Sequence, residues 1–451
     1  MKLKKGTEIV VKIDSLVYGG RGIGSHEGMK VFVEDVVPGD TVKASLSRIK
    51  NNYAEAKLVE VIEKSPQRIE PKCKHFGVCG GCKWQFLSYE DQCKVKEDQV
   101  RDAIVKIGHL DGALVQTIIP NETPWFYRNK MEVSFDTQNR LGLYPKGFHY
   151  EVFDMEECFL QSELMVEIVG KMREFQKKYK IPAYDSETHA GLLRNLIIRE
   201  GKNTGECMVI LVTSTGVFDQ RAEFIALFKD DPRITSLYWT TIYQVPGHPT
   251  FTEETLLHGK PALTEILNLE NGQKLEFDIL PKAFFQTNTK QAEKLYSKVI
   301  ELAGLTGDET VLDLYCGTGT IGLFCAHKAK EIVGIEENEQ AVESARGNAR
   351  KNGITNATFY LGRVEHRLSD LQHKPDVVIV DPPRIGLGEE VVSAVAAFGA
   401  KTVVYVSCNP ATLARDLSYF AGLGYFTQSV TPVDMFPQTH HVESVAVMVR
   451  G

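Results

Sequence analysis

The chain has 451 residues, of which 43% are hydrophobic and 25% charged, and a formal net charge of −7. This length is too great for one ordinary core, so two to three domains are expected. It contains no run of about 18 apolar residues, so a transmembrane helix is not supported. The N-terminus also lacks the apolar core of a signal peptide.

Charge and cysteines narrow the class further. Residues 1–110 carry 19 Lys and Arg against 15 Asp and Glu, a balance of +4, so the rest carries −11. The first quarter is the better polyanion contact, although an ordinary solvated surface explains the same balance. Nine cysteines, several tightly clustered, are typical of a reducing compartment with metal-binding or catalytic thiols. We therefore expect a cytoplasmic protein.

Residues 1–60 alternate short strand-like runs with turns. The turns contain Tyr18–Gly24 and Pro38–Asp40, and strands at such spacing predict a small β-barrel. The expected strands are Glu8–Ile13, Lys30–Val33, Thr41–Lys50 and Ala54–Ile62.

The middle of the chain predicts an α+β region. Residues 71–82 form a cysteine-rich loop, and an amphipathic helix follows from about Tyr89 to Ile107, with Cys93, Val100, Ile104 and Ile107 on one face. Residues 125–280 mix a helix near Ser162–Tyr179 with several strands. These are Met131–Phe135, Asn195–Arg199 and Cys207–Val212.

From about Ala283, apolar strands alternate regularly with helical segments. Buried parallel strands have this pattern, which predicts a doubly wound α/β domain. The strands are Thr310–Leu314, Glu331–Ile335, Ala357–Tyr360, Val377–Val380 and Thr402–Val406, and a further run, Ser444–Val449, is suited to antiparallel pairing at the sheet edge.

The segment Val311–Gly322 predicts a strand that turns into a helix through a glycine-rich loop. Its glycines allow close approach of a ligand. Nineteen residues after Gly317, Glu336 follows the second strand, where a carboxylate can accept both ribose hydroxyls of an adenosine. A nicotinamide domain or a mere turn would look similar. The motif Asp381-Pro382-Pro383 at the end of the fourth strand resembles the loop with which many methyltransferases hold the target base beside the methyl donor, which favours a methyltransferase that uses S-adenosylmethionine.

Ser407-Cys408-Asn409-Pro410 follows the fifth strand and delivers a thiol to the same edge. A thiolate that adds to carbon 6 of a pyrimidine makes carbon 5 reactive toward a methyl donor. Cys316 and Cys325 are expected to pack as small apolar residues, and for Cys408 the alternative is an inert structural thiol. The base that removes the carbon-5 proton is expected near the C-terminus. Spacing does not distinguish its three candidates, which are Glu443, His440 and His441.

Four motifs together resemble the RNA (uracil-5-)-methyltransferases over the whole C-terminal domain. They are Ser407–Pro410, Asp381–Arg384, Phe284–Asn288 and His441–Glu443. The resemblance implies Cys408 as the nucleophile and Glu443 as the base. It also implies a set of contacts around the methyl donor and target base, namely Gln286, Tyr315, Gly317, Thr320, Glu336 and Asp381.

A second cysteine set lies earlier, at Cys73, Cys79 and Cys82, with Cys158 as a distant fourth member and Cys93 as its competitor. Spacing alone allows either an all-thiolate zinc site or an iron–sulfur cluster, and the compartment disfavours a disulfide. The resemblance implies a [4Fe-4S] cluster on Cys73, Cys79, Cys82 and Cys158. Phe159 departs from the proline usual in relatives, but it is not a ligand.

Residues 1–60 also resemble the TRAM domain, through Tyr18–Gly24. Such barrels bind RNA with basic groups and aromatic rings. Tyr127–Lys130 is a second candidate phosphate contact. A target base must leave its stack to reach Cys408, so single-stranded or loop RNA with a flipped-out uridine is expected.

The resulting prediction is a 23S ribosomal RNA (uracil-5-)-methyltransferase, monomeric by default, which modifies one or two uridines. Three parts are expected: a TRAM-like barrel (1–62), an α+β iron–sulfur domain (63–275) and a Rossmann-like methyltransferase domain (276–451), with the helix near 89–110 lying against the last. One alternative is a transfer RNA enzyme of the same chemistry, whose relatives typically lack both barrel and cluster. Others are an adenine amino-group methyltransferase, which would not need Cys408, and a non-catalytic RNA-binding iron–sulfur protein.

Overall fold

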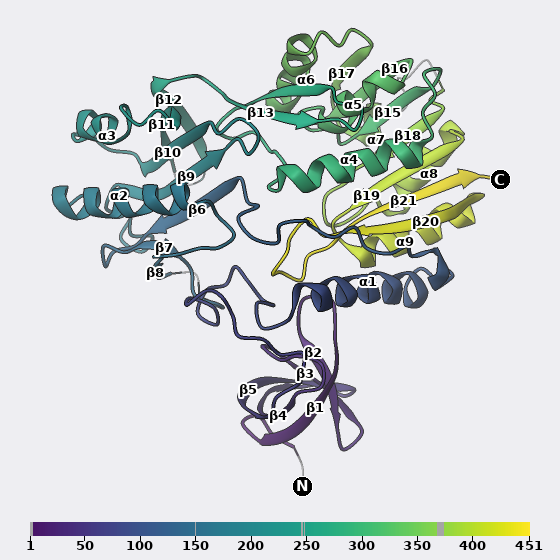
Figure 1. Ribbon diagram of the computed structural model, residues 1–451, viewed down its shortest axis with the longest axis horizontal. Helices are drawn as coiled ribbons and strands as arrows, with labels where there is room; N and C mark the ends of the chain where they lie inside the picture. Colours follow the sequence, from purple (N-terminus) through teal and green to yellow (C-terminus); the bar gives the residue numbers. More distant parts are fainter. Residues whose placement is uncertain (1–2, 149, 245–246, 248, 368–373) are drawn as a thin grey trace.

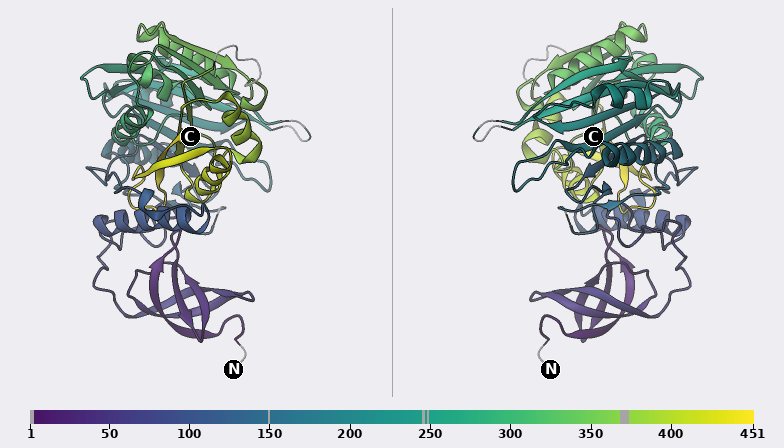
Figure 2. Two further views of the ribbon diagram at one scale, coloured as in Figure 1. Left: turned by 90° about the vertical axis from the view of Figure 1, so that its right-hand side faces the viewer. Right: turned by 90° about the vertical axis from the view of Figure 1, so that its left-hand side faces the viewer.

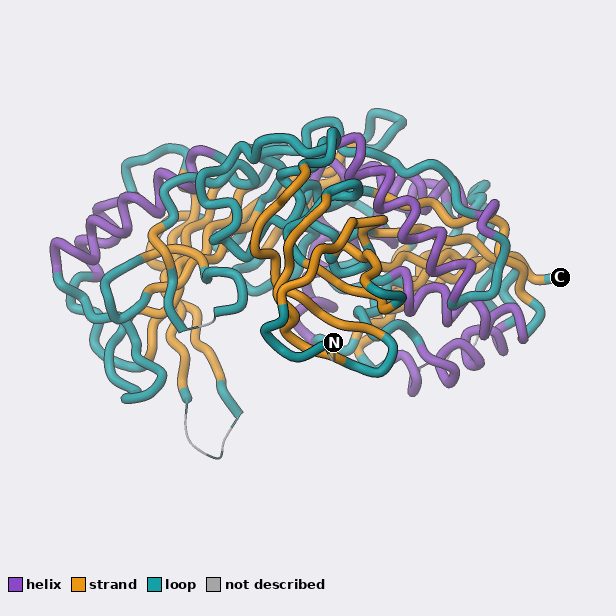
Figure 3. Tube along the Cα trace, turned by 90° about the horizontal axis from the view of Figure 1, so that it is seen from below, coloured by secondary structure: helices purple, strands orange, loops and turns teal. Residues whose placement is uncertain are grey.

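The computed structural model describes residues 3–148, 150–244, 247, 249–367 and 374–451. A small barrel lies below two larger α/β bodies, one built on the central sheet and the other containing the C-terminus (Figure 1). Seen from the barrel side, the barrel lies over the middle of the molecule, between these two bodies (Figure 3). None of the described helices has the length and apolar character needed to cross a membrane.

The N-terminal barrel is closed, with strand order β1-β2-β3-β5-β4. Its strands are β1 (Glu8–Leu16), β2 (Gly22–His26), β3 (Met29–Val33), β4 (Thr41–Ile49) and β5 (Tyr53–Glu63). Alternating side chains such as Val11, Val31 and Ala44 fill its interior. The predicted barrel is confirmed, but part of the predicted glycine-rich turn is strand β2. A Cβ on Gly24 would lie 2.1 Å from the Lys12 carbonyl oxygen, so glycine permits close strand crossing there.

Helix α1 (Tyr89–Lys106) follows the cysteine-rich loop and begins at Ser88, whose side chain accepts from the Asp91 amide. The helix packs on α9 (Pro410–Gly422) of the C-terminal body. Cys93, Val100 and Ile104 are buried there, whereas Ile107 is 43% exposed because the helix ends before it. The chain therefore visits the C-terminal body before it enters the central sheet.

The central body is a seven-stranded mixed sheet in the order β12-β11-β10-β9-β6-β7-β8, which agrees with the predicted α+β region. Met131, Leu196 and Val209 from the sheet pack with Ile168 and Phe224 of helices α2 and α3. The β11–β12 hairpin extends away from the body (Figure 2). The elements are β6 (Lys130–Phe135), β7 (Leu141–Leu143), β8 (Phe153–Asp154), α2 (Glu163–Tyr179), β9 (Leu193–Glu200), β10 (Cys207–Ser214), α3 (Arg221–Phe228), β11 (Ile234–Tyr243) and β12 (Phe251–Gly259).

The C-terminal body is a second seven-stranded sheet, in the order β17-β16-β15-β18-β19-β21-β20. Its first five strands are parallel, so the predicted doubly wound domain is confirmed. The strands are β15 (Thr310–Leu314), β16 (Glu331–Glu336), β17 (Ala357–Leu361), β18 (Val377–Val380), β19 (Thr402–Ser407), β20 (Tyr425–Val433) and β21 (Glu443–Arg450).

Strand β21 pairs antiparallel with β19 as predicted, but its predicted position at the sheet edge is wrong. Strand β20 lies outside it, which keeps the first six residues of β21 buried. The remaining helices and a hairpin complete the body. They are the η1 turn (Gly112–Leu114), β13 (Leu263–Asn268), β14 (Lys274–Ile279), α4 (Thr289–Ala303), α5 (Thr320–Cys325), η2 (Ala326–Lys328), α6 (Glu339–Lys351), α7 (Val364–Arg367) and α8 (Gly388–Phe398).

The hairpin β13–β14 shares one hydrophobic core with α4 and β15. The border predicted between residues 275 and 276 falls inside β14. The domain limits 1–62, 63–275 and 276–451 stay a prediction.

Candidate active site

One edge of the C-terminal sheet gathers the predicted catalytic groups. The carboxyl ends of parallel neighbouring strands lie at the same edge. Strands β15, β16, β18 and β19 are such neighbours, and they lead into the glycine-rich loop, Glu336, Asp381 and Cys408. The fold thus brings together residues that are spread over almost one hundred positions.

The glycine-rich loop after β15 is shaped to bring backbone amides to Glu336. Tyr315, Gly317 and Gly319 all have positive φ. The Gly317 amide donates to Glu336 Oε2 at 3.1 Å, and the Asn338 amide donates to Oε1 at 2.8 Å. The carboxylate is therefore fixed at the tip of β16, where it can accept hydroxyl groups of a ribose.

Two further predicted contacts border this loop. Thr320 is buried at the start of α5, and its hydroxyl lies 3.1 Å from that of Thr318. Burial raises the pKa of Tyr315, and Glu365 acts in the same direction. Asp313, which the sequence analysis did not single out, accepts from the Gly322 amide with one carboxylate oxygen while the other is buried without a partner.

Cys408 follows β19 and is half-buried at the N-terminus of α9. Asn409 caps that helix, because its side-chain oxygen accepts from the Ala411 amide. Its side-chain nitrogen donates to the Arg384 carbonyl at 3.0 Å. A hydrogen bond therefore joins the Asp381–Arg384 motif to the loop that carries Cys408.

The charged groups around Cys408 influence one another. The pKa of Cys408 is raised to about 11, mainly by burial and also by Glu443, while Arg384 acts in the opposite direction. Burial also raises the pKa of Glu443 to about 8, to which Asp381 contributes. Burial alone raises the pKa of Asp381 to about 7. The structure thus assembles a thiol, two carboxyl groups and one guanidinium.

The neighbouring histidines differ from Glu443. Burial lowers the pKa of His440 to about 3 and that of His441 to about 4, with nearby positive charges adding to the effect. Both rings are consequently neutral near pH 7. Their centroids lie 4.0 Å apart.

The loop between β20 and β21, which carries these histidines, is held from outside its own sheet. Gln92 of α1 exchanges two hydrogen bonds with Gln438, at 2.9 and 3.0 Å. Lys96 of α1 forms a fully buried ion pair with Asp434 at 2.6 Å. The amides of Lys83 and Trp84 both donate to the Gln438 carbonyl. No local sequence pattern signals these contacts, because their partners lie more than 330 positions apart.

The central body supplies additional anchors. Tyr127 donates to the Pro437 carbonyl at 3.1 Å, and Asn129 donates to the Gln286 carbonyl at 2.8 Å. Both side chains are buried, so they position other segments and do not face a phosphate. Within the predicted phosphate contact, Arg128 and Lys130 are only partly exposed.

The four predicted ligand cysteines line one small cavity, together with Gln85 and Leu160. The Gly81 amide lies 3.3 Å from the Cys79 sulfur, and the amides of Leu160 and Gln161 lower the pKa of the Cys158 thiol, which burial raises. Burial raises the pKa of Cys82 to about 12. Among the described residues, no three His, Cys, Asp or Glu side chains converge as a single metal ion requires.

An unpredicted residue reaches the catalytic edge from the barrel. The Tyr18 hydroxyl donates to the Cys408 carbonyl oxygen at 3.3 Å, and its ring lies edge-on to His440 at 6.0 Å. The sequence marked this turn only as part of an RNA-binding barrel.

Comparisons with known proteins agree with this architecture. A family model described as tRNA (uracil-5-)-methyltransferase matches residues 252–450, and one described as TRAM domain matches residues 2–59. A model described as DNA methylase matches residues 149–347, a range that ends before Asp381 and Cys408.

The chain is also similar to relatives over nearly its full length. An uncharacterized RNA methyltransferase of Clostridium acetobutylicum is 36% identical and covers 99% of this chain and 98% of its own. One from Bacteroides thetaiotaomicron is 39% identical, with 95% and 98% covered.

Among solved structures, the Pyrococcus abyssi tRNA (uracil-54, C5)-methyltransferase in complex with S-adenosyl-L-homocysteine matches with a TM-score of 0.78. It is 29% identical, and the match covers 98% of this chain and all of that one.

Proposed function

The chain belongs to the RNA (uracil-5-)-methyltransferase family, and we propose that it methylates carbon 5 of uridine in 23S ribosomal RNA. The observation that carries this proposal is the convergence of Cys408, Glu443 and Asp381 at one sheet edge. S-adenosylmethionine is the methyl donor, as the family and the S-adenosyl-L-homocysteine bound to the Pyrococcus enzyme indicate.

Cys408 acts as the nucleophile in this proposal. Its thiolate adds to carbon 6 of uracil, which places negative charge on carbon 5 and allows that atom to accept a methyl group. A base then removes the carbon-5 proton, and the carbon–sulfur bond breaks to release the thiolate. Burial raises the pKa of Cys408, so its thiol is protonated in the free enzyme and must lose its proton when substrate binds.

Glu443 is the base that the electrostatics favour. A carboxylate whose pKa is about 8 accepts a proton near neutral pH far better than an ordinary carboxylate does. His440 and His441, with pKa values lowered to about 3 and 4, are weak bases in comparison. Spacing left three candidates for the base, and their burial favours Glu443 over the two histidines in this proposal.

We assign the methyl-donor contacts as the sequence predicted them. The Glu336 carboxylate, which accepts from the Gly317 amide, can accept the ribose hydroxyls of an adenosyl group. Gln286 belongs to the proposed set through the family resemblance, and its backbone carbonyl, in the segment before α4, accepts from Asn129. Tyr315, Thr320 and Asp381 complete the set.

We also propose that Cys73, Cys79, Cys82 and Cys158 hold a [4Fe-4S] cluster. Four thiols on one cavity, with amides directed at their sulfurs, fit such a group. Each thiolate of a cluster binds a different iron, so the sulfurs stand farther apart than around a single zinc ion. The proposed cluster therefore rests on the four cysteines that share this cavity and on the resemblance to the family.

The ribosomal target rests on the presence of both the barrel and the cysteine set. A transfer RNA target is the second candidate, favoured by the full-length match to the Pyrococcus tRNA enzyme. An amino-group methyltransferase is disfavoured, since the matching DNA methylase model stops before Cys408. Nine free cysteines agree with a cytoplasmic enzyme, and a monomer is the expected form.

Mapping 5-methyluridine in ribosomal and transfer RNA from cells with and without the gene tests the substrate. We expect one or two ribosomal sites to disappear. Loss confined to transfer RNA would replace the ribosomal target by the second candidate. In vitro, RNA with 5-fluorouridine should trap a covalent adduct with wild-type protein and none with Cys408→Ala. Methylation without adduct formation would remove the thiol mechanism.

A further inference from the structure

Tyr18 belongs to the barrel in sequence but to the catalytic edge in space. It lies 390 positions from Cys408, yet its hydroxyl donates to the Cys408 carbonyl oxygen. The residue is 38% exposed, so an incoming molecule can contact it. Burial raises its pKa, and Cys408 adds to the effect. A neutral phenol therefore stands beside the thiol.

The turn that carries Tyr18 is fixed against the rest of the protein. The Lys83 ammonium donates to the Gly19 carbonyl at 3.3 Å, and the Trp84 indole nitrogen donates to the Gly20 carbonyl at 3.5 Å. Gly20 has φ +86°, and a Cβ there would lie 3.2 to 3.4 Å from Lys83, His440 and Trp84. Such close docking holds the aromatic ring in place before any substrate arrives.

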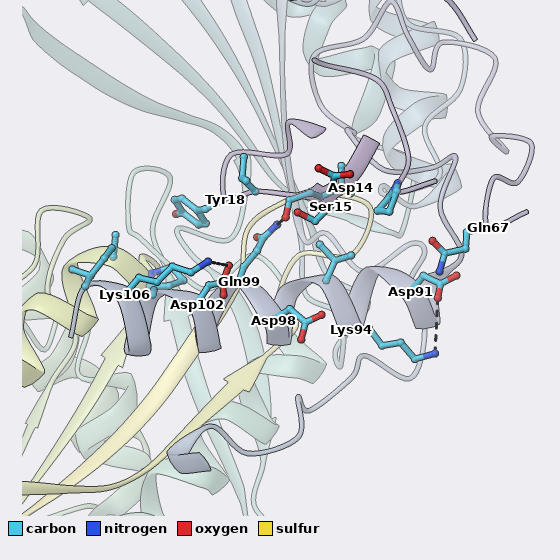
Figure 4. A pocket seen from close by; sticks show the side chains of 18 residues that line it. Asp14, Ser15, Tyr18, Gln67, Asp91, Lys94, Asp98, Gln99, Asp102 and Lys106 are labelled. Atoms are coloured by element: carbon cyan, nitrogen blue, oxygen red, sulfur yellow. Dashed lines mark hydrogen bonds and ion pairs between the residues drawn. The ribbon is translucent and has the colours of Figure 1, made fainter. Parts of the chain in front are cut away.

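Acidic and basic side chains both lie near this ring. A groove between the barrel and α1, bordered by Tyr18, has aspartates along it (Figure 4). They are Asp14, Asp91, Asp98 and Asp102. The two lysines of the groove are paired, Lys106 with Asp102 and Lys94 with Glu90 and Asp91, so the acidic excess of the groove comes from Asp14 and Asp98. Phosphates are therefore repelled from that side.

Positively charged side chains lie near His441. Burial lowers the pKa of His441, and four cations reinforce the shift. They are Arg384, Lys96, Lys83 and Arg128. Lys96 is buried in its ion pair, whereas Arg384 is exposed. Tyr18 borders the acidic groove and also lies within the electrostatic influence of Arg384, the exposed cation of the four, which can meet an RNA phosphate.

We propose that Tyr18 is a substrate-contacting residue whose ring stacks on an RNA base next to the target uridine. The inference rests on the proposed function, because it takes Cys408 as the nucleophile. A uridine that leaves its stack exposes the faces of its neighbours, and an aromatic ring replaces the lost stacking. The Tyr18 hydroxyl meanwhile holds the backbone of Cys408. The barrel is thus part of the active site as well as a general RNA-binding module.

Steady-state kinetics on unmodified 23S ribosomal RNA transcribed in vitro test this role. Tyr18→Leu should raise the KM for RNA on the order of tenfold or more, since base–aromatic stacking is strong, with kcat within about threefold. Tyr18→Phe keeps the ring and should restore KM. Tyr53→Leu is the matched control, because Tyr53 begins β5 at the barrel end opposite Leu16. A Tyr18→Leu KM within twofold of wild type overturns the proposal.

Photo-cross-linking of the wild-type protein covers the case in which Tyr18→Leu fails to fold. RNA with 5-iodouridine on either side of the target should cross-link to the peptide that contains Tyr18. Cross-links confined to other peptides would overturn the proposal. Failure of the proposed function looks different, because the wild-type protein would then neither methylate this RNA nor form the 5-fluorouridine adduct.

Discussion

The catalytic edge and the cysteine cavity are built in opposite ways. Cys408 and Asp381 follow buried strands of one sheet, and a direct bond joins their loops. The cavity cysteines come from two loops that lie 76 positions apart, between Cys82 and Cys158, and none of the four is fully buried. The fold itself therefore orders the first site, whereas we expect the second to gain its final order from the proposed [4Fe-4S] cluster.

The two regions are nevertheless neighbours through one loop. Lys83 and Trp84, directly after Cys82, donate backbone hydrogen bonds to Gln438, which lies five positions before Glu443. Helix α1 grips the same loop through Gln92 and Lys96. A disturbance of either region is expected to reach the other through Gln438.

The largest effect is expected at the strand-built site. Cys408→Ser should reduce methylation at least ~10³-fold, because a hydroxyl is a far weaker nucleophile at neutral pH. Its unfolding free energy should stay within about 0.5 kcal/mol of wild type. Single-turnover kinetics and urea denaturation measure the two quantities. Cys93 lies outside both regions, so the control variant Cys93→Ala should retain turnover. A serine variant with a tenth of normal activity would contradict the assignment.

The next effect concerns the buried ion pair between Lys96 of α1 and Asp434. Lys96→Met leaves Asp434 charged and buried, which should cost about 3–5 kcal/mol of unfolding free energy. The double variant Lys96→Met, Asp434→Leu should recover part of this loss. Urea denaturation measures both. Lys94→Met removes an exposed pair with Glu90 and should cost no more than about 0.5 kcal/mol. Equal losses for Lys96→Met and Lys94→Met would mean that burial does not matter here.

The next prediction concerns the cysteine cavity and the [4Fe-4S] cluster proposed there. Cys82→Ala removes the thiol whose pKa burial raises most among the four, to about 12. We expect iron to be lost from protein purified without oxygen, and the unfolding free energy to fall by about 2 kcal/mol. Iron analysis and urea denaturation follow these changes. Cys93→Ala should keep its iron. An iron content that survives Cys82→Ala would exclude Cys82 as a ligand.

The last effect is a pH dependence of stability at the catalytic edge. The pKa of Glu443 is raised from 4.5 to about 8, so the folded protein binds its proton more tightly than the unfolded chain does. Stability should therefore fall as pH rises from about 4.5 to about 8. Glu443→Gln has no proton to lose and should gain about 3–4 kcal/mol relative to wild type between pH 5 and pH 8. Asp381, Arg384 and Cys408 face this carboxyl group. Parallel stability curves would contradict the buried carboxyl group.

Local patterns were sufficient for the sites at strand ends. Glu336, Asp381 and Cys408 each follow an apolar run, and parallel strands must place such ends together. The edge position of β21 was wrong, because nothing in Ser444–Val449 shows that β20 pairs outside it. Tyr18 and Gln438 were missed for a related reason. Their partners lie hundreds of positions away, and a single tyrosine or glutamine carries no periodic signal.

Helix α1 has a consequence for how the protein is made. It leaves the ribosome early, yet Asp434, the partner of its Lys96, is synthesised 338 residues later. Until then Lys96 has no ion-pair partner and the apolar face of the helix is not covered by the C-terminal body. These long-range contacts therefore form last during synthesis. A nascent chain can mature its barrel at once, but it acquires a finished catalytic pocket only when the C-terminal strands are released.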